Sequence, residues 1–96
     1  MTPAFSVRTD AHFERLARPM RKHHRDFDGF FLRAVEILEI DPFNVTRSHP
    51  IKKLTDVPKG KGQYRLRLGR WRFRYDIYGQ EVVLIYCGLR REDIYD

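Results

Sequence analysis

The sequence predicts an α+β fold, with two N-terminal helices packed on one face of a mostly antiparallel four-stranded sheet, in the order β-α-α-β-β-β. Three observations predict this class. Apolar residues recur at helical spacing in the first 40 residues, two glycine-containing turns divide the last third into strand-like segments, and an alternating segment opens the chain. The 96 residues are expected to form one domain, residues 1–96, because chains this short rarely divide into two cores.

The first half of the chain predicts one strand and two helices. Residues 5–8 alternate between apolar and polar side chains, which indicates a short strand. Asp10 is positioned to cap a first helix, which Pro19 should kink or end because proline lacks an N–H and clashes with the preceding turn. Asp41, which precedes Pro42, should end the second helix. The two apolar stripes comprise Phe13, Leu16, Ala17 and Met20, then Phe27, Phe30, Phe31, Ala34, Val35 and Leu38.

The second half predicts an irregular region followed by a three-stranded meander. Residues 42–62 are rich in proline and glycine and end in a basic loop at residues 59–62. The strands and turns that follow are 63–68, Gly69-Arg70, 71–78, Gly79-Gln80 and 81–88. Each turn has glycine at its first central position, as a type II′ hairpin requires. The last strand is apolar on both faces, so we expect it to be central, with the opening strand along its other edge.

Alternation along the first hairpin predicts that four arginines share one face of the sheet. The core face takes the apolar pairs Tyr64–Tyr75, Leu66–Phe73 and Leu68–Trp71. On the opposite side, here called the arginine face, Arg67 lies across from Arg72 and Arg65 lies across from Arg74. Directly opposed like charges destabilise a sheet by up to ~1 kcal/mol per pair. Phosphate binding explains this block better than folding does; arginines that splay apart into solvent are the alternative.

The same alternation divides the last strand between the two faces. The core face is expected to take Val82, Leu84 and Tyr86, and the arginine face Val83, Ile85 and Cys87. Cys87 is the only cysteine, which excludes an intramolecular disulfide and a thiolate zinc cage. We interpret it as a small buried hydrophobe rather than a nucleophile.

The positive charge is concentrated in one segment. The net charge is +6, yet from Arg47 to Arg74 the chain has ten Lys or Arg residues and one acid, Asp56. The remainder has nine basic and twelve acidic residues. A local basic field suits a phosphate backbone, and a solvated basic surface is the alternative. The sequence shows neither a signal peptide nor an apolar run of membrane-spanning length, so we expect a soluble cytoplasmic protein.

The C-terminal third resembles the RelE/ParE toxin superfamily. The likeness is carried by Tyr64-Arg65-Leu66-Arg67-Leu68-Gly69, by Arg72-Phe73-Arg74-Tyr75, and by Gly88-Leu89-Arg90-Arg91 with Ile94-Tyr95. The opening strand and helix pair fit the family's element order. The resemblance implies the toxin of a type II toxin–antitoxin system, a ribosome-dependent mRNA endonuclease that enters the ribosomal A site, inhibits translation and is silenced by a cognate antitoxin.

Carried over by position, the resemblance implies catalytic roles for Arg67, Arg72, Arg90 and Tyr95. Arg67 and Arg72 would hold the scissile phosphate, with Arg90 near the leaving 5′-oxygen. Tyr95 would orient or stack on a base, or Trp71 would do so if the register were different. The residues expected to bind RNA more generally are Arg65, Arg74, Lys52, Lys53, Lys59, Lys61 and Arg91. No cofactor or metal is expected, because the acids and histidines are not at ligand spacing.

The general base is the open part of this mechanism. The family's prototype has lysines where this chain has Arg65 and Arg67, and an arginine with a pKa above about 12 stays protonated. His49, near the basic loop, is a candidate base. Glu92 and Asp93 are expected to pair with neighbouring arginines rather than to act as bases.

Two other functions stay open from the sequence. One is a non-enzymatic inhibitor of DNA gyrase, like ParE, and the other is a catalytically inactive RNA- or ribosome-binding module. In the gyrase-poisoning branch the closing arginine and tyrosine are usually absent. Arg90 and Tyr95 therefore favour the ribonuclease branch.

Overall fold

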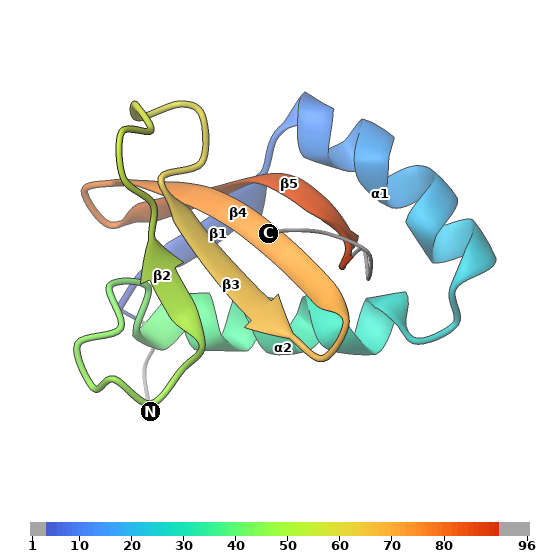
Figure 1. Cartoon of the computed structure of the whole chain (residues 1–96), viewed down its shortest axis with the longest axis horizontal. Coiled ribbons are helices and arrows are strands. Elements are labelled where there is room, and N and C mark those ends of the chain that lie inside the picture. Colours follow the sequence, from blue (N-terminus) through green and yellow to red (C-terminus); the bar gives the residue numbers. More distant parts are fainter. Residues whose placement is uncertain (1–3, 91–96) are drawn as a thin grey trace.

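Two helices cover one face of a five-stranded mixed sheet in the computed structural model, which describes residues 4–90 (Figure 1). The predicted α+β class is therefore confirmed. The elements are β1 (Ser6–Thr9), α1 (Ala11–His23), α2 (Phe27–Ile40), β2 (Ile51–Lys53), β3 (Tyr64–Leu68), β4 (Trp71–Tyr78) and β5 (Glu81–Leu89). The strand order is β1-β5-β4-β3-β2, and β1 runs parallel to β5 while the other neighbours are antiparallel. Within residues 4–90, neither helix has the length and apolar character that a membrane crossing needs.

The predicted count of four strands was wrong, because β2 forms an additional edge strand inside the region expected to be irregular. Ile51 pairs with Leu66, and Lys52 pairs with Arg65. Three residues are too few to show a period of two in the sequence, and Pro50 precedes them. The expected central place of β5, between β1 and β4, is confirmed.

The two helices begin and end close to the predicted positions, with one difference at Pro19. Helix α1 is capped by Asp10, whose carboxylate accepts a hydrogen bond of 2.8 Å from the N–H of Phe13. The helix continues past Pro19 to His23, so the proline does not end it. Pro19 and Arg15, whose carbonyl the proline cannot bond, are both exposed, so water can take the place of the missing donor.

The hairpin of β3 and β4 is held against the start of α2 by contacts to Asp26. Trp71 is fully buried, packs edge-on against Phe27 at a ring-centroid distance of 5.1 Å, and donates its indole N–H to the Asp26 carboxylate at 3.1 Å. Arg70, in the turn, also donates to Asp26 at 3.3 Å. Hydrogen bonds from Arg70 and Trp71 hold the pKa of the Asp26 carboxyl below its usual value. These contacts fix the turn relative to the helix layer.

A buried carboxylate organises the chain where α2 ends. The Asp41 carboxylate accepts hydrogen bonds from the Val45 N–H at 2.8 Å, the Thr46 N–H at 3.1 Å and the Thr46 hydroxyl at 2.6 Å. Burial by itself raises the pKa of Asp41, but the hydrogen bonds from Thr46 and Val45 outweigh it, so the pKa lies below its usual value. The charged form of Asp41 therefore stabilises the fold.

We predict that Asp41→Asn lowers the free energy of unfolding by about 1–3 kcal/mol at pH 7. The NH2 group of asparagine would face the donor groups of Val45 and Thr46 and could accept no hydrogen bond from them. A lowered folded-state pKa gives a contribution that is present above the unfolded pKa of about 4 and is lost as the pH falls through the folded value. The difference between wild type and variant should therefore shrink as the pH falls below about 4. Urea unfolding at pH 7, 5, 4 and 3 measures it; a constant difference would contradict the assignment.

Candidate nucleic-acid interface

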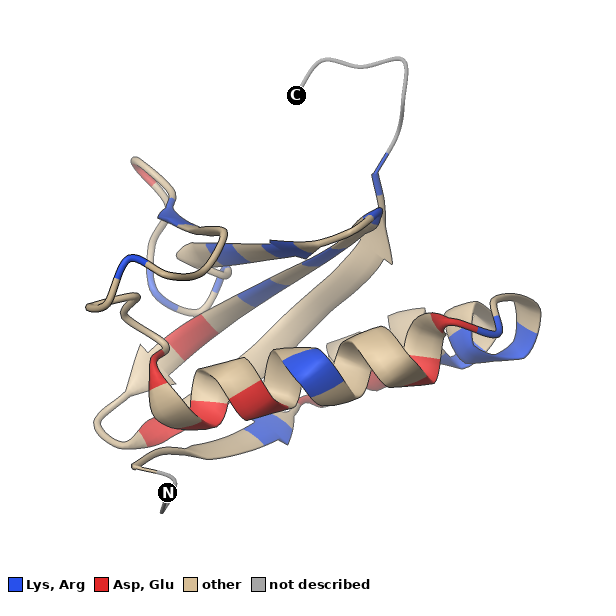
Figure 2. Cartoon of the chain, turned by 90° about the horizontal axis from the view of Figure 1, so that it is seen from below, with Lys and Arg blue, Asp and Glu red and all other residues tan. Residues whose placement is uncertain are grey.

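Four arginines lie on one face of the sheet in the predicted register. Arg67 pairs with Arg72 and Arg65 pairs with Arg74, while Trp71 and the other core-face residues of the hairpin are buried. All four arginines are half-buried. In Figure 2, blue bands alternate with tan along the strands of the hairpin, whereas the helix in front of them carries both signs of charge. The arginine face is thus a concentrated patch of positive charge.

Strand β2 extends this patch by one more cation. Lys52 is exposed and pairs with Arg65, which pairs in turn with Arg74. A row of three cations therefore crosses β2, β3 and β4, beside the second row formed by Arg67 and Arg72. Adjacent strands lie about 4.8 Å apart, so the members of each row are close neighbours.

Within residues 4–90, Arg67 and Arg74 form no ion pair with a carboxylate. Arg74 instead donates from Nε and Nη2 to the carbonyl of Gly62, at 3.2 and 2.9 Å. A carbonyl oxygen orients the guanidinium without cancelling its charge. The described residues therefore neutralise the charge of neither arginine, and the Gly62 carbonyl orients that of Arg74.

The basic loop at residues 59–62 is clamped over the Arg74 end of the arginine face. Asp76 is fully buried and accepts hydrogen bonds from the N–H groups of Gly62 and Gln63, both at 2.9 Å. Gly62 has a φ of +82°, and a Cβ there would lie 3.0 Å from the Cβ of Arg74. Glycine is therefore required both by conformation and by space.

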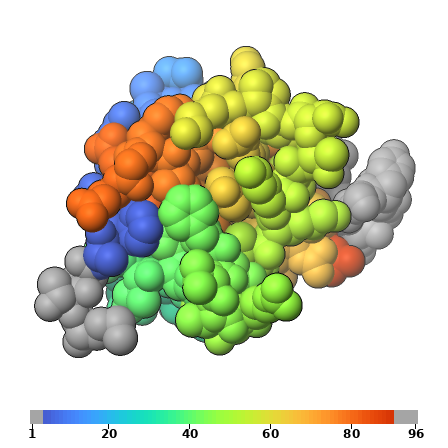
Figure 3. Space-filling model, turned by 90° about the vertical axis from the view of Figure 1, so that its left-hand side faces the viewer, coloured from blue at the N-terminus to red at the C-terminus, as the bar shows by residue number. Residues whose placement is uncertain are grey.

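Nearer its tip, the same loop rests on the end of the sheet. The ammonium of Lys59 lies 5.1 Å from the ring centre of Tyr78. The space-filling view shows the loop, in yellow, against the β4–β5 end of the sheet, in orange (Figure 3). The basic loop is thus tied to the sheet at two places, through Asp76 and through Tyr78.

A β-bulge in β5 changes which side chains join the arginine face. The register shifts so that Tyr75 pairs with Leu84 but Arg74 pairs with Tyr86, which leaves Ile85 as the extra residue. Tyr86 therefore lies on the arginine face, and Cys87 pairs with Phe73 in the core. The predicted faces of Tyr86 and Cys87 were wrong, whereas the core positions of Val82 and Leu84 are confirmed.

The buried position of Cys87 also fixes the chemistry of its thiol. Its exposed fraction is 1%, and burial raises the pKa of the thiol to about 12. A thiol that stays protonated at neutral pH is a poor nucleophile. The interpretation of Cys87 as a buried hydrophobe is confirmed.

The ring of Tyr86 lies over Gly88. A Cβ built on Gly88 would clash with the phenol oxygen of Tyr86 and would lie 3.0 Å from its Cζ. Gly88 pairs with Arg72, so the phenol reaches the β5 residue directly across from that arginine. Tyr86 keeps 36% of its surface exposed. Gly88 thus makes room for an aromatic ring beside the arginine rows.

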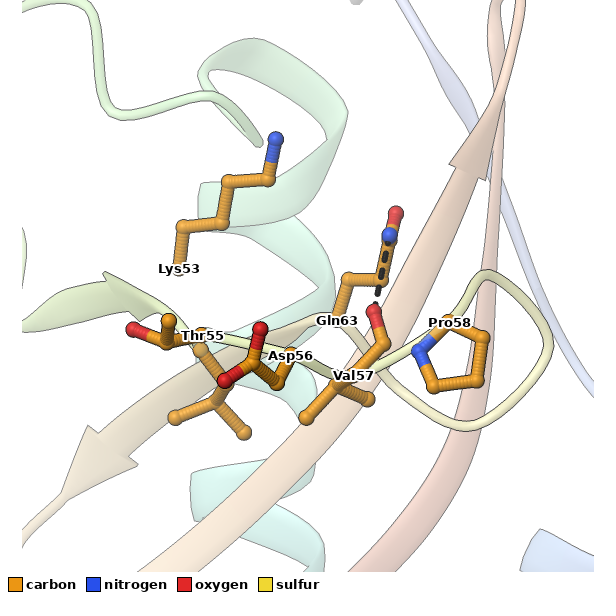
Figure 4. Close-up of a pocket in the computed structure, with 7 residues that line it drawn as sticks. Lys53, Thr55, Asp56, Val57, Pro58 and Gln63 are labelled. Atoms are coloured by element: carbon orange, nitrogen blue, oxygen red, sulfur yellow. Dashed lines mark hydrogen bonds between the residues drawn. The ribbon is translucent and has the colours of Figure 1, made fainter.

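Two surface pockets flank the basic loop. One, of about 360 Å³, lies between the loop, β5 and the start of α1; its lining is Asp10, His12, Gly60, Lys61, Arg74, Ile85 and Tyr86. The other, of about 620 Å³, is lined by Gln63 and by residues 53–58, which connect β2 to the basic loop (Figure 4). The Gln63 side chain donates a hydrogen bond to the Val57 carbonyl at 3.0 Å. Only the first pocket includes residues of the arginine face.

The remaining predicted site residues are dispersed. Lys53 lies over the ring of Tyr64, a core-face residue, at 5.7 Å, so it does not join the arginine face. Arg90 is exposed beyond β5, and its N–H donates to the Arg70 carbonyl at 2.7 Å, which places it at the β3–β4 turn end of the sheet. The expectations for Arg91, Glu92, Asp93 and Tyr95 fall outside the described residues.

The candidate base-stacking residue Trp71 and the candidate general base His49 do not reach the arginine face. Trp71 is fully buried, so it is not the stacking residue. His49 lies 3.9 Å from the Asp41 carboxylate and lines a pocket with residues of α2, on the helix side of the sheet. The structure therefore gives no support for His49 as a general base. Within residues 4–90, no three His, Cys, Asp or Glu side chains cluster as a metal site would require.

The chain matches no family model, no curated protein and no solved structure.

We predict that Arg67→Thr raises the free energy of unfolding by up to ~1 kcal/mol at low salt, because it removes one member of an opposed like-charge pair and introduces a good strand former. The gain should fall as salt rises, since screening weakens the repulsion. Urea unfolding at 20 mM and 500 mM salt measures both effects. A destabilised variant at low salt would show that Arg67 is held by attractive contacts instead.

Proposed function

We propose that this chain binds RNA phosphates on its arginine face and cleaves mRNA on the ribosome, as the toxin of a type II toxin–antitoxin system of the RelE kind. The observation that supports this most strongly is the pair of opposed arginine pairs, Arg67–Arg72 and Arg65–Arg74. The proposal includes a cytoplasmic location and a cognate antitoxin as partner. It rests further on the likeness of residues 63–95 to that superfamily.

The arrangement suits a phosphodiester for electrostatic and geometric reasons. Each guanidinium presents a planar fork of donors that can contact two phosphate oxygens, and it stays charged at all physiological pH values. A phosphate between Arg67 and Arg72 would replace their repulsion with two attractions. The adjacent row, Lys52, Arg65 and Arg74, would then take a neighbouring phosphate of the same strand.

RNA supplies its own nucleophile to such a site. The 2′-oxygen attacks the adjacent phosphorus, the bond to the 5′-oxygen breaks, and the products are a 2′,3′-cyclic phosphate and a 5′-hydroxyl. Arg67 and Arg72 would stabilise the added negative charge of the pentavalent transition state. Arg90 would approach the leaving oxygen from the turn end of the sheet. Alignment and charge stabilisation then carry most of the rate. Ribosomal groups accept the 2′-proton, and water supplies the proton that the leaving 5′-oxygen takes up.

We predict that expression of the wild-type chain arrests growth and generates new mRNA 5′ ends on translating ribosomes, and that Arg72→Ala lowers this cleavage at least a hundredfold because it removes transition-state charge stabilisation. Arg33→Ala, an exposed arginine on α2, is the matched control and should leave cleavage unchanged. Mapping of mRNA ends from ribosome-associated RNA measures the effect.

Three outcomes of that experiment separate the candidate functions. Growth arrest with DNA breaks and no new mRNA ends would indicate the gyrase-inhibitor alternative. Ribosome binding without cleavage would indicate an inactive RNA-binding module. Equal cleavage by wild type and Arg72→Ala would remove the arginine face from the mechanism.

We predict that binding of a short single-stranded RNA weakens with salt at a slope of about −2 to −3.5 in log affinity against log salt concentration, as three to five phosphate contacts require. Lys52→Ala should reduce the size of this slope by about 0.7, whereas Arg33→Ala should not change it. Fluorescence anisotropy from 50 to 300 mM salt measures both. A slope near zero would contradict phosphate binding by this face.

A further inference from the structure

The pocket beside Arg74 has a lining unlike that of the arginine rows. Its lining includes one apolar and one aromatic side chain, Ile85 and Tyr86, and two cations, Lys61 and Arg74. His12 and the N-cap Asp10 add polar groups to the lining. A volume of about 360 Å³ lies within the range of pockets that hold small organic ligands.

Tyr86 is the part of this lining that needs a functional explanation. It is 36% exposed, although the strand that carries it is otherwise largely buried. The bulge at Ile85 turns its ring onto the arginine face, and Gly88 leaves room for the ring to lie along the strand. Bulges are frequent beside binding sites because they re-aim a side chain in this way.

The pocket lies beside the arginine rows, and this position indicates which chemical group it would bind. Arg74 belongs both to the pocket and to the first row, and Arg72 is two residues away on β4, or roughly 7 Å. The phenol of Tyr86 reaches the residue across from Arg72. A planar ring on Tyr86 would therefore lie next to a phosphate held between Arg67 and Arg72.

We infer that this pocket binds the nucleobase of the nucleotide next to the phosphate held by Arg67 and Arg72, with Tyr86 as the stacking surface and Lys61 and Arg74 on the attached phosphate. The inference rests on the proposed function and adds a base-binding subsite to it. Stacking on an aromatic ring tolerates any base, since every base has a π-face. His12 and Asp10 would then meet the base edge.

The experiment compares a hexamer of uridine with an abasic ribose-phosphate hexamer of the same length. Tyr86→Thr, which keeps a strand-forming residue, is expected to weaken binding of the uridine hexamer about tenfold and to leave binding of the abasic hexamer unchanged. Tyr86→Phe should bind both as wild type does, because the ring is kept. Gly88→Ala, which displaces the ring, should weaken only the uridine hexamer.

Phe43→Thr is the matched control, since this aromatic ring is 50% exposed, contacts Phe5 and Tyr64, and does not line the pocket. It should not change the preference for the uridine hexamer. The buried Trp71, the only tryptophan, reports by its fluorescence that each variant is folded.

The outcomes separate the pocket from the proposed function. If Arg67→Ala weakens both hexamers but Tyr86→Thr weakens neither, the base pocket is refuted while phosphate binding stands. If wild type binds neither hexamer, both are refuted. Equal weakening of both hexamers by Tyr86→Thr would mean that the ring only supports the sheet, and would also overturn the inference.

Discussion

The register of the β3–β4 hairpin is the constraint on which both faces of the sheet depend. A slip of one residue would bury all four arginines and expose Trp71 and Phe73. The pairing of the two strands therefore cannot shift by one residue without exchanging the core face and the arginine face. Gly69 sets the turn with a φ of +59°, and a Cβ there would lie 3.1 Å from the Phe30 ring. The contacts of Arg70 and Trp71 with Asp26 then tie that turn to α2.

The magnitudes explain why this fold tolerates opposed arginines. Each pair costs up to ~1 kcal/mol, whereas full burial of one large apolar side chain stabilises by about 1.5–3 kcal/mol. Leu66, Trp71, Phe73 and Tyr75 are all fully buried on the opposite face of the same two strands. The core therefore determines the register, and the register in turn places the four arginines on the opposite face.

The sequence predicted the parts of the site that follow from local regularity. The opposed arginines follow from a two-residue turn and strict alternation, which are both visible in the sequence. Strand β2 was missed because three residues carry no detectable period. The bulge at Ile85 was missed because residues 82–87 are all apolar or aromatic. A shift in which side chains face the core therefore does not change the hydrophobic pattern of the sequence. The place of His49 depends on Asp41 and Asn44, contacts that a loop sequence does not reveal.

Tyr86, which was not predicted to lie on the arginine face, differs in chemistry from the predicted arginines. Guanidinium and ammonium groups bind any phosphate backbone, so under the proposed function the regular rows would position a strand without distinguishing its sequence. Discrimination among nucleotides requires contact with the bases as well as with the backbone. Tyr86 reaches the arginine face only because the bulge shifts the register after Ile85 and Gly88 lacks a side chain. Under the proposed function, affinity for the phosphates would follow from the regular pleat of β3 and β4, and contact with a base would follow from the bulge at Ile85.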